Sequence, residues 1–272
     1  PQRQLRAAVP GAEAVARILR QYGVERERIV ALYDRTATRA SAVSHLQGAF
    51  RRDVAPGDSL FIYFAGHCRL DPATKDVAWL LADAAENTAS SYLYLKDLQI
   101  LLGRIPARHV LVVADSCIED GLIGSSKISG DPTIRETSQK KSRWVIAAGV
   151  PAPQPEVGDG QSRLSAFTRA FVETLRDKQL AYLTPLHIQQ DMEERLTSAA
   201  GPALTGGPMT GLGDEDGQFV FHLEGAAPPS EEPRVPARED PRIAKLRQYI
   251  ETGRSINLPQ ALKDQVVAYL QG

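Results

Sequence analysis

Two apolar segments, Ser59–Ala65 and residues 109–114, most constrain how this 272-residue chain can fold. Their sequences, SLFIYFA and HVLVVA, are apolar at nearly every position instead of at alternate positions. Such a strand must be covered on both faces, as happens in parallel sheets that lie between layers of helices. Residues 143–148 (RWVIAA) predict a third strand of this kind.

Helical patterns alternate with these strands. Val15, Ile18 and Tyr22 recur with a helical period, and Gly23 follows as a helix terminator. Further helices are predicted at residues 40–50, 95–103, 165–175 and 185–196, and weaker strands at residues 28–33, 77–82 and 218–223. The polar residues 119–142 and the glycine-rich residues 201–217 are predicted to be loops. The alternation predicts an α/β fold, a three-layer sandwich with a mainly parallel sheet flanked by helices.

The first two strands each lead into a reactive side chain, His67 after one and Cys117 after the other. Ligands of open parallel sheets bind beyond the carboxyl ends of the strands, so adjacent strands would place these residues across one crevice. An imidazole beside a thiol lowers the thiol pKa, and it can later protonate a leaving amine. The backbone N–H groups of Cys68 and Cys117 are candidate donors to the oxyanion.

The sequence around these two residues resembles the caspase and metacaspase superfamily. An aromatic strand ends in Y-x-x-G-H at His67, and a second strand ends in D-S-C at Cys117. The separation, 117 − 67 = 50 residues, is the spacing expected for caspases. The segment WVIAAG at residues 144–149 is similar to the strand that opens the small-subunit half of the family. The resemblance covers roughly residues 5–223 and implies an endopeptidase with a His/Cys dyad.

The resemblance also implies a specificity residue. Two positions before the cysteine, caspases have a Gln, whereas metacaspases have an Asp and cleave after Arg or Lys. Asp115 occupies that position, and a carboxylate in the S1 pocket attracts a basic P1 side chain. Glu156 is a weaker candidate for a second acid in this pocket. Alternatively, Asp115 caps a helix or accepts hydrogen bonds from loop N–H groups.

The resemblance divides the chain into parts. The peptidase domain is expected at residues 1–224, with a large-subunit-like part at 1–118, an interdomain activation loop at 119–142 and a small-subunit-like part at 143–224. A Pro-rich linker is predicted at residues 225–241, followed by a small helical appendage at 242–272 that either packs on the body or docks a partner. A zymogen that cleaves after basic residues would be activated in this loop or at its end, where the candidate cut sites are Arg135, Lys140, Lys141 and Arg143.

Cys68 departs from the family, which usually has glycine after the catalytic histidine. It is interpreted as structural, with pairing to Cys117 as a redox off switch as the alternative. The chain has only these two cysteines, a net charge of −1 and no apolar run near the ~20 residues that span a bilayer. These features favour a cytoplasmic protein that binds neither nucleic acid nor membrane. The dyad needs no cofactor, and the histidines show no metal-ligand spacing.

The function expected from these residues is a regulated cysteine endopeptidase in a cell-death or defence cascade. Its partners would be protein substrates and an upstream activating protease or a regulatory protein. The alternative is a catalytically weak or inactive caspase-fold scaffold that binds partners through its C-terminal helices. The substitution at Cys68 favours this scaffold, whereas the intact pair of His67 and Cys117 opposes it.

Overall fold

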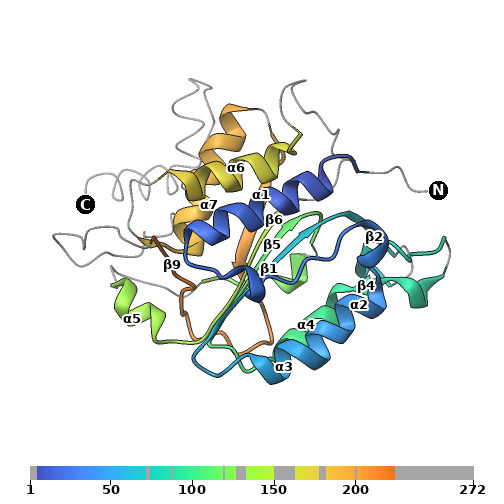
Figure 1. Ribbon diagram of the computed structural model, residues 1–272, viewed down its shortest axis with the longest axis horizontal. Coiled ribbons are helices and arrows are strands. Elements are labelled where there is room, and N and C mark those ends of the chain that lie inside the picture. The colour runs from blue at the N-terminus through green and yellow to red at the C-terminus, as the bar shows by residue number, and fades with distance from the viewer. Residues whose placement is uncertain are drawn as a thin grey trace, which may run out of the picture. The chain divides into compact units, whose positions relative to one another are not determined.

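The computed structural model describes residues 5–71, 74–86, 88–118, 120–126, 133–149, 163–177, 182–199 and 201–223 (Figure 1). Within them, the main sheet has the strand order β1-β5-β6-β8. Its parallel neighbours are β1 (Ser59–Ala65), β5 (His109–Asp115) and β6 (Ser142–Ala148), and β8 (Leu204–Pro208) lies antiparallel to β6. The three strands predicted from their apolar sequences therefore form the parallel centre of a mixed sheet.

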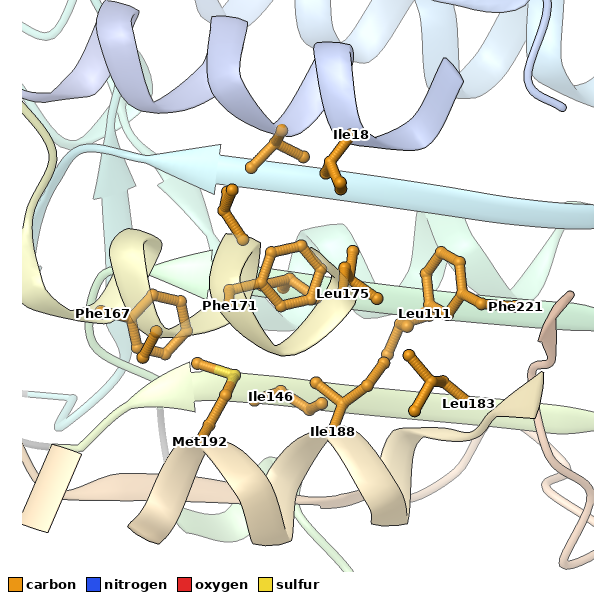
Figure 2. Close-up of a cluster of buried hydrophobic side chains, with 14 of the residues drawn as sticks. Ile18, Leu111, Ile146, Phe167, Phe171, Leu175, Leu183, Ile188, Met192 and Phe221 are labelled. Atoms are coloured by element: carbon orange, nitrogen blue, oxygen red, sulfur yellow. The ribbon is translucent and has the colours of Figure 1, made fainter. Parts of the chain in front are cut away.

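Helices cover both faces of this sheet, as the three-layer prediction requires (Figure 1). Residues of β5 alternate between two cores, since Leu111 and Val113 face one and Val110 and Val112 face the other. The first core, shown in Figure 2, packs against α1 (Ala8–Gln21), α6 (Ala166–Arg176) and α7 (Pro185–Ser198). The second packs against α4 (Leu95–Gly103) and the consecutive turns α2 (Arg39–Ser44), η3 (His45–Ala49) and α3 (Phe50–Asp53).

The helices α6 and α7 begin at side-chain caps. The Ser165 hydroxyl accepts a hydrogen bond of 3.0 Å from the backbone N–H of Thr168, which satisfies one of the free donors at the start of α6. Thr184 caps α7 in the same way, and Pro185 occupies the first turn, where its missing N–H costs nothing. Both helices were predicted, and both are confirmed.

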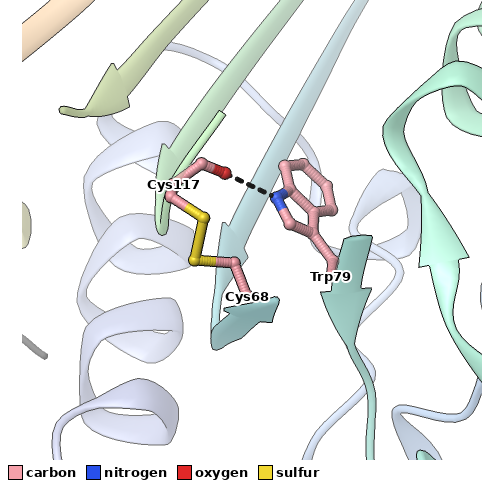
Figure 3. The surroundings of a disulfide bond; sticks show 3 residues. All are labelled: Cys68, Trp79 and Cys117. Carbon is pink, nitrogen blue, oxygen red and sulfur yellow. Dashed lines mark hydrogen bonds between the residues drawn. A yellow bond between two sulfur atoms is a disulfide. The ribbon is translucent and has the colours of Figure 1, made fainter. Parts of the chain in front are cut away.

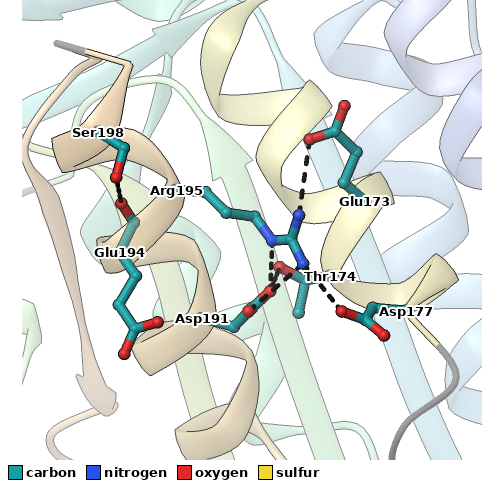
Figure 4. A network of polar contacts seen from close by, with 7 residues as sticks. All are labelled: Glu173, Thr174, Asp177, Asp191, Glu194, Arg195 and Ser198. Carbon is teal, nitrogen blue, oxygen red and sulfur yellow. Dashed lines mark hydrogen bonds and ion pairs between the residues drawn. The ribbon is translucent and has the colours of Figure 1, made fainter.

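An ion-pair network joins α6 and α7 on their outer side (Figure 4). Arg195 of α7 donates to Asp191 one turn earlier, and it lies 3.8 Å from Glu173 and 3.4 Å from Asp177 at the end of α6. The hydroxyl of Thr174 donates to the same Asp191 carboxylate. Because the Arg195 side chain is 30% exposed, each of these pairs contributes at most about 1 kcal/mol, and the network mainly orients the helices.

A small second sheet follows β1 directly. The chain passes through Gly66 into β2 (His67–Leu70), which pairs antiparallel with β3 (Val77–Leu80). β3 in turn pairs with β4 (Leu93–Tyr94), which follows the turn η4 (Ala89–Ser91). The strand predicted at residues 77–82 is thus confirmed, but it belongs to this sheet and not to the main one.

The strand predicted at residues 28–33 is wrong. The turns η1 (Arg26–Arg28) and η2 (Asp34–Thr36) bracket a segment without a strand, and Val30 is 44% exposed. The residues are branched and apolar, but no neighbouring strand pairs with them in the described part of the chain.

The glycine-rich loop predicted at residues 201–217 is also wrong in part, because it contains β8. A Cβ atom at Gly206 would lie 2.7 Å from the side-chain oxygen of Gln189 and 2.9 Å from the carbonyl oxygen of Val145. Glycine therefore allows this edge strand to lie close to both α7 and β6. The strand predicted at residues 218–223 contributes only β9 (Phe221–His222), which pairs with β7 (Tyr182–Leu183) outside the main sheet.

The activation loop predicted at residues 119–142 is only partly a loop. It holds the turn η5 (Asp120–Leu122) and the helix α5 (Ile134–Ser138), which begins at a capping box of Thr133 and Glu136. Residues 119 and 127–132 lie outside the described residues, as do the predicted linker 225–241 and the appendage 242–272. In the described part of the chain, no helix is both long enough and apolar enough to cross a bilayer.

Candidate active site

The main sheet brings His67 and Cys117 to the same edge. β1 and β5 are parallel neighbours in register from Ser59 opposite His109 to Ala65 opposite Asp115, and the N–H of Gly66 lies 3.5 Å from the carbonyl oxygen of Asp115. His67 and Cys117 each lie two positions after the last pair of this register, Ala65 and Asp115. The two strands are therefore adjacent, which is the condition that a shared crevice required. His67 lines one end of a cavity of about 610 Å³ that extends along β1 to the start of α1.

The sulfur of Cys117 is bonded to that of Cys68, the residue next to His67 (Figure 3). The two Cα atoms are 5.9 Å apart, and both residues are partly exposed to solvent. A free thiolate at Cys117 and a free thiol at Cys68 thus belong to a reduced form of the protein. The two backbone N–H groups expected to bind the oxyanion come from these same two residues, so the bond lies at the centre of the candidate site.

Trp79 supports the segment that carries Cys117, and the sequence analysis missed it. Its indole Nε1 donates a hydrogen bond of 3.1 Å to the carbonyl oxygen of Cys117, as Figure 3 shows. The indole is 2% exposed and stacks on Phe64 of β1, with ring centroids 4.1 Å apart and planes inclined by 11°. The only sequence signal was the position of Trp79 in the short apolar strand VAWL. The role of Trp79 was not visible in the sequence because it depends on a contact with a residue 38 positions away.

Asp115 ends β5 beside the start of α6. Its carboxylate accepts hydrogen bonds from the hydroxyl of Ser165 and, at 2.7 Å, from that of Thr168. The hydroxyl of Tyr63 lies 2.6 Å from the Thr168 hydroxyl and extends this chain of polar groups. Burial raises the pKa of Asp115, and the two hydroxyl donors oppose that rise. Burial also raises the pKa of Tyr63, with a further contribution from the charge of Asp115. Both donors are side-chain hydroxyls, so these contacts anchor the start of α6 to β5 and do not test the predicted helix cap or loop N–H bonds. The S1 role of Asp115 also stays a prediction.

The candidate self-cleavage residues differ in accessibility. Arg135 and Lys140 are exposed, and Lys141 is partly buried. Arg143 is in β6 and is 1% exposed, and its guanidinium donates to the carbonyl oxygens of residues 105, 107, 108 and 142. The interpretation of Arg143 as a cut site needs correction, because a peptidase cannot bind a residue inside a central strand. Glu156, the weaker S1 candidate, lies outside the described residues.

Comparison with known proteins places these features in a family. A crystal structure of a protein from Geobacter sulfurreducens is similar with a TM-score of 0.49 and 18% sequence identity, over 75% of this chain and 85% of that one. No curated protein matches the sequence. The family model of the caspase domain matches residues 2–205, which include the strands β1 and β5 and the helix α6 that contacts Asp115. The chain therefore belongs to the caspase domain family.

Proposed function

We propose that this protein is a cysteine endopeptidase in which Cys117 is the nucleophile and His67 is the general base. The observation that carries the proposal is the parallel register of β1 and β5, because it delivers both residues to one edge of the sheet. In the reduced protein, the imidazole lowers the pKa of the thiol and later protonates the leaving amine. The N–H groups of Cys68 and Cys117 are the oxyanion donors in this proposal.

We propose cleavage after Arg or Lys. Asp115 supplies a carboxylate two residues before the nucleophile, and its two hydroxyl donors engage one oxygen atom, Oδ2. In this proposal, the other oxygen of the carboxylate binds the basic P1 side chain. An acidic P1 side chain would instead meet a negative charge in a partly buried site, which costs several kcal/mol.

The proposed physiological form is a cytoplasmic zymogen in a cell-death or defence cascade, acting on protein substrates and answering to an activating protease or regulatory protein. The exposure of Arg135 and Lys140 supports activation by cleavage near α5. The disulfide favours a second candidate function, an inactive scaffold, because it occupies the thiol that catalysis needs.

The test is a peptidase assay on the fully reduced protein. Fluorogenic peptides with Arg, Lys or Asp at P1 are offered to the wild type, to Cys117→Ala and to His67→Ala, after thiol alkylation has shown two free thiols in the wild type. Turnover of Arg and Lys peptides that disappears in both variants supports the peptidase. A reduced, folded wild type that cleaves none of the peptides, with or without prior cleavage near α5, would leave the scaffold as the function.

A further inference from the structure

The two cysteines of the chain meet in a single bond although they are 49 residues apart. Both pack against the second core and are partly exposed, and their Cα separation of 5.9 Å needs no movement of the backbone to form a disulfide. Cys68 belongs to β2, and Cys117 follows β5, so the bond links the small sheet to the main one. Its position at the candidate nucleophile points to a chemical role in addition to packing.

We propose that the Cys68–Cys117 disulfide is a reversible modification site, opened by a dithiol reductant and closed by hydrogen peroxide, with Cys68 as the resolving cysteine. The inference rests on the proposed function in one respect, namely that Cys117 is the sulfur that catalysis uses. The modification then determines whether the nucleophile exists, since a disulfide sulfur has no thiolate charge.

Opening proceeds by thiol–disulfide exchange. A thiolate of the reductant attacks the sulfur of Cys68, Cys117 leaves as a thiolate, and a mixed disulfide with Cys68 remains. The second thiol of the reductant then attacks its own sulfur in that mixed disulfide, which releases the thiol of Cys68 and a cyclic disulfide. Two electrons and two protons pass from the dithiol to the protein. Attack on Cys68 is the direction that matters for the proposal, because it makes Cys117, the proposed nucleophile, the leaving thiolate.

Closing uses the same two residues in the reverse order. The Cys117 thiolate attacks hydrogen peroxide, which cleaves the O–O bond and gives a sulfenic acid and hydroxide. The thiol of Cys68 then attacks that sulfur and gives its proton to the departing oxygen, which leaves as water and restores the disulfide. Because Cys68 lies within bonding reach, this step competes with further oxidation of Cys117 to the irreversible sulfinic acid.

Contacts other than the disulfide hold the two segments that it joins. Seven residue pairs join β1 to β5, and four pairs join β2 to β3. The indole of Trp79 holds the carbonyl of Cys117, so the cysteine segment has its own tether to β3. Opening the bond therefore frees the two sulfurs and leaves the sheets in place.

The first experiment does not depend on activity. The purified, oxidised chain is treated with dithiothreitol without denaturant, its free thiols are alkylated and counted by intact mass, and its fold is followed by circular dichroism. We expect two alkylations with unchanged secondary structure, and recovery of the unmodifiable form after peroxide. A bond that opens only in urea, or that peroxide does not restore, overturns the proposal.

The second experiment tests the role of Cys68 with a variant that cannot form the bond. After peroxide, Cys68→Ser should carry sulfinic acid on Cys117 that dithiothreitol does not reverse, whereas the wild type should return to two thiols. Sulfinic acid in equal amounts in both proteins overturns the assignment of Cys68.

A third experiment compares the peptidase activity of each protein before and after reduction. Reduction should raise the turnover of Arg or Lys peptides by about 100-fold in the oxidised wild type and by less than about 3-fold in Cys68→Ser kept free of oxidant, whatever its own rate. A similar dependence on dithiol in both proteins counts against the proposal. If the bond opens and closes as expected but the reduced wild type cleaves no peptide, the modification site stands and the proposed peptidase fails.

Discussion

The indole N–H of Trp79 donates a hydrogen bond to the carbonyl oxygen of Cys117 at 3.1 Å, so a residue of the small sheet holds the segment that carries the candidate nucleophile. Attack on a carbonyl carbon needs the sulfur within a few tenths of an ångström of its productive position. We therefore expect Trp79 to act as a positioning residue for Cys117.

Trp79→Phe should lower kcat of the reduced enzyme several-fold, with little change in KM. Phenylalanine keeps an aromatic ring on Phe64 but leaves the Cys117 carbonyl without its donor, which costs about 1–3 kcal/mol of stability. The matched control is Trp144→Phe, because the indole Nε1 of Trp144 has no hydrogen-bond partner in the described part of the chain. Equal losses of kcat in both variants, measured with Arg peptides, would show that Trp79 acts only through packing.

Asp115→Asn separates the S1 role of Asp115 from its helix-anchoring role. The amide oxygen can still accept from Ser165 and Thr168, so the start of α6 should keep its contacts while the negative charge is lost. We expect kcat/KM for Arg and Lys peptides to fall by about 100-fold, with stability unchanged or higher. Thr168→Val is the control, because it removes one of these contacts and keeps the charge. Unchanged kinetics in Asp115→Asn would leave only the anchoring role.

The raised pKa of Asp115 also predicts a pH dependence of the wild type. The folded protein holds this proton more tightly than the unfolded chain, so the carboxyl stabilises the fold at low pH and loses that contribution as the pH rises through its raised pKa. Binding of a basic P1 side chain needs the ionised form. KM for Arg peptides should therefore rise as the pH falls through the same range, and Asp115→Asn should lack this rise.

Self-cleavage should occur after Arg135 or Lys140 and not after Arg143. The first two residues are exposed, whereas Arg143 is buried in β6 with four carbonyl oxygens around its guanidinium. The variant that combines Arg135→Gln with Lys140→Gln should stay a single chain by intact mass under reducing conditions. Lys141→Gln is the matched control and should be cut like the wild type, because the Lys141 backbone is already held by residues 215 and 217.

His187 predicts a loss of stability in mild acid. Burial lowers the pKa of His187 to about 4, and its Nδ1 accepts hydrogen bonds from Thr184 at the start of α7. The unfolded chain binds this proton near pH 6.5 and the folded one only near pH 4, so stability should fall by about 2–3 kcal/mol as the pH drops across that range. Urea unfolding at several pH values measures the loss.

His187→Gln should remove most of that loss, because glutamine suits the third position of a capping box and does not titrate. The control is His222→Gln, since His222 is exposed on β9. If the acid sensitivity persists in His187→Gln, the titrating group lies elsewhere in the chain.

Much of the fold was predictable because burial on both faces leaves a local pattern. Ser59–Ala65 and His109–Asp115 are apolar at consecutive positions, as is typical of a parallel strand covered on both faces. The same reasoning failed for residues 28–33, which are equally apolar but have no strand beside them within the described residues. It also missed β8, because glycine is rare in strands and the reason for Gly206 lies in α7 and β6.

The order of residues along the chain was thus sufficient to identify the parallel centre of the sheet, the helices on its two faces and the pair His67 and Cys117 at its edge. Those features depend on composition within a few consecutive positions, where periodicity reports burial directly. The tertiary structure decided the rest: that Cys68 bonds to Cys117, that Trp79 holds the segment after β5, and that Arg143 is buried. Each of these depends on atoms that are distant in sequence, and only the packed sheets determine which of them come within bonding distance.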